Sequence, residues 1–191
     1  MDAQTVAIIG WVGTLSELRD DTEGKHNERV QKYLKQLMEA AKISDWDSEA
    51  VLLGAVLHDV GKIKIPDSIL LKKGRLTNRE FEEMKNHCLY GRELIEGLQK
   101  QLPGEPFLEH AKIMAYYHHE KWDGTGYPEG LKGADIPLEA RMMALVDVYD
   151  VLVSKRPYKP SYPHDQAMGM IREGKGSHFD PDLVELFEEV I

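Results

Sequence analysis

Histidine and aspartate side chains recur in this 191-residue chain at positions where helical spacing turns them toward apolar neighbours. Buried imidazoles and carboxylates are costly unless a cation or hydrogen-bond partners compensate them. A protein of this size rarely buries many such groups without a metal ion. Metal ligation is therefore the chemistry that this set predicts, and its members are His26, His58, Asp59, His87, His118, His119 and Asp147.

Each of these residues taken alone has a plainer explanation. His58 and Asp59 are adjacent and are compatible with a simple hydrogen bond at the end of a helix. A single histidine on an apolar helix face, such as His87, is more often a hydrogen-bonded core residue than a ligand. Together, mixed imidazole and carboxylate groups suit iron, manganese or zinc, and a carboxylate able to bridge suits two metals. Cys88, beside His87, is interpreted as a small buried apolar residue.

Helices must position these residues, because apolar side chains recur at steps of three and four and strand alternation is rare. We expect an N-terminal helix in residues 1–14 and a second helix over 26–41. A very apolar helix, capped by Ser44 with Asp47, should end near Gly61. Thr77 and Glu80 form the pattern of a capping box. The remaining helices are expected at 77–98, 107–119, 138–154 and 180–190, so the fold class is all-α, a single domain of about seven helices.

Composition excludes several classes of protein. The chain is 42% hydrophobic, which excludes a disordered protein, and it has no apolar run near the roughly 20 residues of a membrane helix. The net charge of −9 argues against binding of long nucleic acids, so an anionic ligand needs local positive charge. The single cysteine predicts a reducing, cytoplasmic location.

Residues 58–62, HDVGK, resemble the HDxGK signature of the HD superfamily of metal-dependent phosphohydrolases. Residues 118–128, HHEKWDGTGYP, resemble the HHExxDGxGYP motif of its HD-GYP subfamily. Further matches follow in the family's order, and the resemblance covers residues from about 15 to 191. They are IPL at 136–138, AR at 140–141, DVYD at 147–150, RPYK at 156–159 and HFDP at 178–181.

The resemblance implies an HD-type helical domain with a buried metal site and a cyclic di-GMP phosphodiesterase activity. The implied product is linear pGpG, cut further to GMP in some members, and a hydroxide between two metals is the expected nucleophile. The implied metal ligands are the seven residues above, with Asp59 bridging two metals and acting with Lys62 in catalysis. Substrate binding is implied for Lys62, Tyr127, Asp150, Arg156 and Lys159.

The chain departs from the family's pattern just before His26. The family often has a glutamate four residues upstream of this histidine that supports a third metal, whereas here that position is Thr22 and the carboxylate is Glu23. We therefore expect two divalent ions, iron or manganese, and leave a third open.

Two alternatives to this enzyme stay open. One is a catalytically weak, metal-containing sensor or docking module that binds a diguanylate cyclase (GGDEF) domain through the glycine-rich turn at 123–133. The other is an HD phosphohydrolase for a different cyclic dinucleotide. The resemblance also suggests a homodimer. It further suggests that residues 1–14 are the remnant of a link to an upstream regulatory domain.

Overall fold

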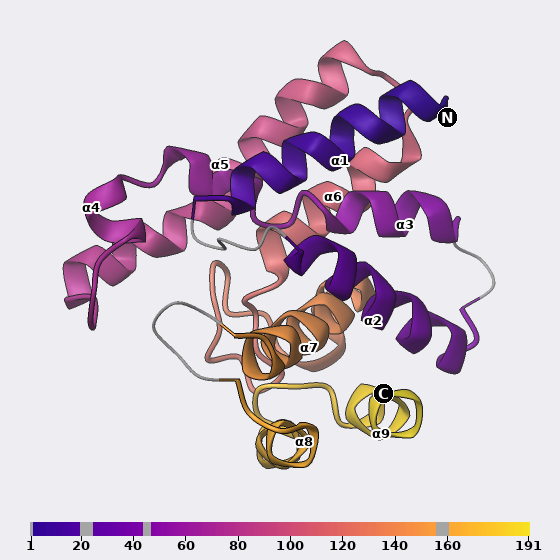
Figure 1. The fold of residues 1–191 in the computed structure, drawn as a ribbon, viewed down its shortest axis with the longest axis vertical. Helices are drawn as coiled ribbons and strands as arrows, with labels where there is room; N and C mark the ends of the chain where they lie inside the picture. The colour runs from indigo at the N-terminus through magenta and orange to yellow at the C-terminus, as the bar shows by residue number, and fades with distance from the viewer. Residues whose placement is uncertain (1, 20–24, 44–46, 156–160) are drawn as a thin grey trace.

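The structure is a computed structural model that describes residues 2–19, 25–43, 47–155 and 161–191. Within these ranges the chain forms helices and a single isolated bridge between Lys175 and Phe179, so the all-α prediction is confirmed (Figure 1). The α-helices are α1 (Ala3–Glu17), α2 (His26–Ala40), α3 (Ser48–Ala55), α4 (Asp67–Leu70), α5 (Asn78–Gln101), α6 (Pro106–Tyr117), α7 (Leu138–Val153), α8 (His164–Glu173) and α9 (Pro181–Val190). Two short 3₁₀ helices are η1 (Val60–Lys64) and η2 (Gly133–Asp135).

Capping side chains lie at helix starts that the sequence predicts. Thr77 and Glu80 form a reciprocal capping box at the start of α5. Asp47 accepts from the first backbone N–H groups of α3, while Ser44 lies outside the described residues. Asp180 caps α9, with Pro181 in its first turn.

The apolar helix that was expected to reach Gly61 ends earlier, at Ala55. The chain then turns, so that His58 and Asp59 lie in the connection to η1 rather than on α3. Gly61 explains the tight path that follows, since a Cβ there would come within 1.9 Å of the carbonyl oxygen of His87. This contact places η1 directly against α5. Two helices were not predicted. Helix α4 is only one turn long, and α8 begins directly after Pro163.

The hydrophobic core has two parts. One lies among α2, α7, α8 and α9, and the other among α1, α3, α5 and α6. Helix α3 contributes to both, and α6 packs on both α5 and α7. The predicted metal ligands come from elements of both parts, with His26 on α2 and Asp147 on α7 in the first and His87 on α5 in the second. None of the helices that the described ranges contain combines the length and apolarity required to cross a membrane.

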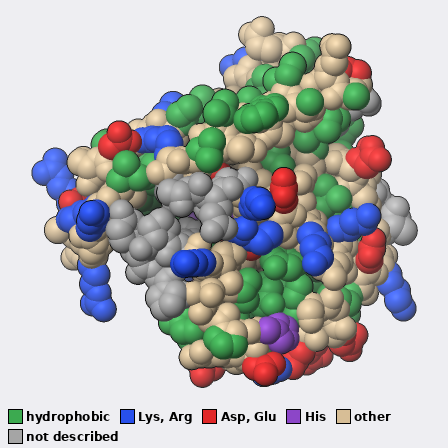
Figure 2. Space-filling view, in the orientation of Figure 1, with side chains coloured by type: hydrophobic (Ala, Val, Ile, Leu, Met, Phe, Trp, Pro, Cys, Tyr) green, Lys and Arg blue, Asp and Glu red, His purple; other side chains and the backbone are tan. Residues whose placement is uncertain are grey.

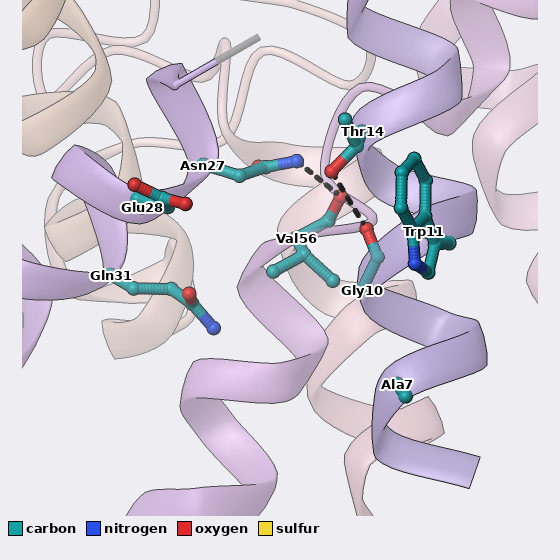
Figure 3. A pocket seen from close by; sticks show the side chains of 8 residues that line it. All are labelled: Ala7, Gly10, Trp11, Thr14, Asn27, Glu28, Gln31 and Val56. Carbon is teal, nitrogen blue, oxygen red and sulfur yellow. Dashed lines mark hydrogen bonds between the residues drawn. The ribbon is translucent and has the colours of Figure 1, made fainter. Parts of the chain in front are cut away.

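Helix α1 crosses the molecule beside α2 and α3 and approaches the backbone after α3 closely (Figure 1). A Cβ at Gly13 would lie 2.5 Å from the carbonyl oxygen of Val56. The same oxygen accepts a hydrogen bond of 3.3 Å from Nδ2 of Asn27 on α2 (Figure 3). Thr14 turns its hydroxyl back to the carbonyl of Gly10 at 3.0 Å (Figure 3). The carbonyl of Val56 is thus contacted both by α1, at Gly13, and by the start of α2, at Asn27.

Candidate metal centre

Five elements bring the predicted ligands together. His26 begins α2, His58 and Asp59 follow α3, and His87 lies in the middle of α5. The remaining ligands are His118 and His119 at the end of α6 and Asp147 on α7. His26, His58, His87 and His118 are at most 3% exposed, although all are polar. Burial of four imidazoles beside carboxylates requires that their ring nitrogens have partners.

Backbone carbonyl groups hold three of these rings by the same nitrogen. Nδ1 of His58 lies 2.9 Å from the oxygen of Ala55, Nδ1 of His87 lies 2.7 Å from that of Met84, and Nδ1 of His118 lies 2.8 Å from that of Met114. Since a carbonyl only accepts, each Nδ1 carries the proton and donates. Nε2 is therefore the nitrogen of each ring that is available to a metal ion, the arrangement typical of metal-binding histidines.

Asp59 lies where these Nε2 atoms converge. Its Oδ1 is 3.4 Å from Nε2 of His87 and 3.6 Å from Nε2 of His118. Its Oδ2 is 3.4 Å from Nε2 of His58 and 2.6 Å from Nζ of Lys62. Burial opposes ionisation of Asp59, but the adjacent Lys62 and His58 outweigh it and hold its pKa well below the usual range. Two oxygens facing different histidines fit a bridging carboxylate.

His26 is held differently, between two carboxylates of α7. Its Nδ1 lies 2.7 Å from Oδ2 of Asp150 and its Nε2 lies 3.3 Å from Oδ1 of Asp147. Burial lowers the pKa of His26, but these two hydrogen bonds outweigh it and raise the pKa to about 10. Surroundings that attract a proton so strongly at Nε2 would also attract a divalent cation there.

Asp150 was expected to line the substrate pocket, and the structure places it underneath His26. Its side chain is fully buried. Besides His26, its oxygens accept hydrogen bonds of 2.7 and 3.0 Å from Nε and Nη2 of Arg29 and one from the hydroxyl of Ser154. These contacts orient His26 and occupy the carboxylate.

Glu17, at the end of α1, is a site residue that the sequence reasoning missed. It is 4% exposed, and burial raises the pKa of its carboxyl to about 7. One of its oxygens and ring nitrogens of His26 and His58 all lie within 4.8 Å of one another. The spacing from Ile9 through Gly13 to Glu17, one helical turn at each step, is the signal that places it on the buried face of α1.

A second cluster contains Asp59, His87, His118 and His119, whose ligand atoms also lie within 4.8 Å of one another. Burial lowers the pKa of His87 to about 4, and burial together with His118 and His87 holds the pKa of His119 well below its ordinary value. Both rings are therefore neutral at pH 7, which metal ligation requires. The donor set, with its carboxylates and correctly oriented neutral imidazoles, fits divalent metal ions.

The glycine-rich turn closes one side of this second cluster. The ring of Tyr127 packs on that of His119, with centroids 4.9 Å apart and an angle of 30°. Glu120, buried to 2% exposure, pins the turn because its carboxylate accepts three backbone hydrogen bonds. They come from Glu129 at 2.7 Å and from Gly130 and Leu131 at 3.0 Å each. The positions predicted to bind substrate phosphate, Arg156 and Lys159, and the pair Thr22 and Glu23 lie outside the described residues.

Comparison of the sequence with known proteins finds several that are similar over most of this chain. A cyclic di-GMP phosphodiesterase of Vibrio cholerae is 47% identical over 190 residues, which are 95% of this chain and 38% of that protein. A 3'3'-cGAMP-specific phosphodiesterase 2 of the same organism is 40% identical over 173 residues, covering 91% of this chain and 32% of that protein. The chain therefore spans less than half the length of these curated relatives.

A solved structure described as Bd1817, a HDG"Y"P protein from Bdellovibrio bacteriovorus, has the same fold, with a TM-score of 0.66 at 19% identity. The alignment covers 86% of this chain and 51% of that chain. The sequence model of the HD domain family matches residues 13–183, and this range includes every ligand candidate that the structure describes. The chain belongs to the HD domain family.

Proposed function

We propose that this domain is a metal-dependent phosphodiesterase that hydrolyses cyclic di-GMP to linear pGpG, with GMP as a further product. One observation carries the proposal: His58, His87 and His118 donate from Nδ1 to backbone carbonyls and direct Nε2 toward Asp59. A buried hydrogen-bonded core would not require several lone pairs to converge on one carboxylate. The names of the similar Vibrio cholerae proteins support a cyclic dinucleotide as the substrate.

Two divalent cations, iron or manganese, would be held by the two clusters. His87, His118 and His119 would hold one, His26 and His58 the other together with Asp147, and Asp59 would lie between them. When bound, such cations supply a water of lowered pKa and positive charge for the phosphoryl oxygens. The Nδ1 hydrogen bonds of His26, His58, His87 and His118 would hold these rings with Nε2 directed to the cations.

Positive side chains of this acidic chain would bind the substrate phosphates. Lys62 Nζ, 2.6 Å from Asp59, lies beside the centre and offsets the charge that develops on the phosphoryl oxygens. Lys and Arg side chains gather in the middle of the face that Figure 2 shows, below a row of hydrophobic side chains over α1. Tyr127 would line the pocket, and Arg156 and Lys159 would bind phosphate.

The activity is tested with metal-reconstituted protein, cyclic di-GMP and chromatographic separation of products. We expect pGpG to appear with Mn²⁺ or Fe²⁺ and not with excess chelator. Lys62→Met should lower kcat/KM by at least tenfold while leaving metal content unchanged, because it removes charge without removing a ligand. Lys72→Met, on a lysine paired with Glu80 at the start of α5, is the matched control.

Two results would contradict this proposal in different ways. Hydrolysis of 3'3'-cGAMP with no turnover of cyclic di-GMP would reassign the substrate within the same reaction. Tight binding of cyclic di-GMP or of a GGDEF domain without any turnover by the metal-loaded protein would favour a sensor or docking module. The GGDEF partner, the homodimer and the cytoplasmic location stay predictions.

A further inference from the structure

The carboxylate of Glu17 is buried with half of its hydrogen-bonding capacity unused. Oε2 accepts a long hydrogen bond of 3.4 Å from the backbone N–H of Asn27. Oε1 is buried and has no hydrogen-bond partner among the described residues. A carboxylate that is 4% exposed and only half satisfied is costly unless a cation compensates it.

The neighbours of Glu17 are metal-ligating groups from two other elements. Its carboxylate oxygen lies within 4.8 Å of ring nitrogens of His26 and His58, which are themselves within 4.8 Å of each other. Nε2 of His58 also has no hydrogen-bond partner in the described part of the chain, although it lies 3.4 Å from Oδ2 of Asp59. Ligands of a divalent metal lie about 2.0–2.2 Å from it, so ligand atoms about 4 Å apart can share one ion. Two imidazoles and a carboxylate are a donor set of iron and related metals.

The backbone fixes Glu17 in this position. Gly13, one turn earlier on α1, allows the helix to approach the carbonyl of Val56, because a Cβ there would be 2.5 Å from that oxygen. Two residues after Glu17, Arg19 donates to the carbonyls of Lys62 at 2.6 Å and Ile65 at 2.9 Å. These hydrogen bonds hold the end of α1 against η1, the segment that carries Lys62. The Glu17 carboxylate therefore lies beside His26 and His58.

We propose that Glu17 is a ligand of the second metal ion and completes a site with His26 and His58. The proposal rests on the proposed function only in that both require a metal centre. It takes the carboxylate from α1, and it makes no use of Glu23. One ion would then have His87, His118 and His119 as ligands, and the other Glu17, His26, His58 and Asp147, with Asp59 between the two.

The test counts metal in the full chain rather than activity. Wild-type protein is stripped with chelator, titrated with Mn²⁺ by calorimetry and analysed for bound manganese. We expect two ions per chain for the wild type. In Glu17→Gln the second ion should be lost or bound at least tenfold more weakly, while the first is retained. Glu139→Gln is the matched control. Glu139 is also a buried glutamate, but it lies at the start of α7 and pairs with His110 of α6. Glu23→Gln should leave both ions bound.

A second measurement separates ligation from a structural role. Removal of an uncompensated buried charge should not lower the melting temperature of metal-free Glu17→Gln below that of metal-free wild type. The increase in melting temperature on adding Mn²⁺ should be smaller than in wild type, because this stabilisation grows with affinity. A metal-free protein that melts at a lower temperature, with an unchanged response to Mn²⁺, would identify Glu17 as structural only.

The outcomes distinguish the two proposals. Two tightly bound ions in Glu17→Gln, or loss of one ion in Glu23→Gln instead, would overturn the assignment while leaving the phosphodiesterase intact. Wild-type protein that binds no metal would overturn both. Loss of one ion in Glu17→Gln, in a protein that does not hydrolyse cyclic di-GMP, would support the ligand and reject the proposed function.

Discussion

Nδ1 of His26 lies 2.7 Å from Oδ2 of Asp150, so a carboxylate on α7 fixes the ring that begins α2. The same carboxylate accepts from Nε of Arg29, one turn further along α2, at 2.7 Å. Two contacts to one helix define how α2 crosses α7, and they leave Nε2 of His26 turned toward Asp147 and the cluster. Asp150 therefore positions His26, which we propose as a metal ligand.

Asp150→Asn should weaken both the fold and the metal site. Loss of the fully buried charge leaves Arg29 without its carboxylate, which costs about 3 kcal/mol of unfolding free energy. It also removes the acceptor that orients His26, so affinity for the second ion should fall about 10–100-fold. Urea unfolding in chelator measures the first effect, and Mn²⁺ titration the second. Wild-type values in both would show that Asp150 does not position His26.

Asp59→Ala should remove metal and phosphodiesterase activity together. Its two oxygens face His87 and His58 on opposite sides, so neither cluster keeps a full donor set without it. Elemental analysis should find less than one ion per chain, and circular dichroism should retain most of the helical signal because Asp59 lies outside the α-helices. Asp135→Ala, at an exposed aspartate of η2, is the control. Full metal content in Asp59→Ala would exclude a bridging role.

The histidines of the centre were predictable because helical periodicity and short motifs encode them. His87 lies on the apolar face of a long helix with a capping box, and the structure confirms that helix and the burial of this residue. The pairs at 58–59 and 118–119 follow helices whose apolar content is visible in the sequence. Local pattern is sufficient where a residue's direction depends on its own helix.

Contacts made by packing of distant elements could not be read in the same way. Glu17 meets His58 only because α1 approaches the turn after α3 at Gly13, a relation that no local pattern carries. Asp150 was expected to bind substrate, but the crossing of α2 places it under His26. The early end of α3 has the same origin, since η1 packs against α5 at Gly61.

Glu120→Gln should loosen the turn that carries Tyr127. A glutamine offers one acceptor and one donor where three backbone N–H groups need acceptors, so one N–H group would face another donor. We expect a loss of about 2 kcal/mol, because hydrogen bonds to a charged acceptor are among the stronger ones. Hydrogen exchange of the amides of residues 129–131 should become faster, and KM should rise as Tyr127 leaves His119.

Glu129→Gln is the control for this change, because Glu129 lies on the same turn with an exposed side chain. It should leave exchange at residues 130 and 131 as in the wild type. Unchanged exchange in Glu120→Gln would mean that the turn is held by other contacts, such as the backbone hydrogen bond from Tyr127 to His119.

His178 should make the metal-free domain sensitive to mild acid. Its ring stacks on Phe179, with centroids 4.2 Å apart and planes 12° from parallel. Burial and then Lys121 lower its pKa from 6.5 to about 4. Between pH 6.5 and pH 4, His178 is therefore protonated in the unfolded chain but largely neutral in the folded chain. Stability from this group is present above pH 6.5 and is lost as pH falls toward 4.

His178→Phe keeps a stacked ring and cannot titrate. Between pH 7 and pH 4.5, the variant should therefore lose about 1–2 kcal/mol less unfolding free energy than wild type loses. The difference is this small because solvent screens the partly exposed ring. Urea unfolding with excess chelator at both pH values measures this difference without a contribution from metal release. Equal losses in the two proteins would show that His178 titrates normally and that other groups cause the acid sensitivity.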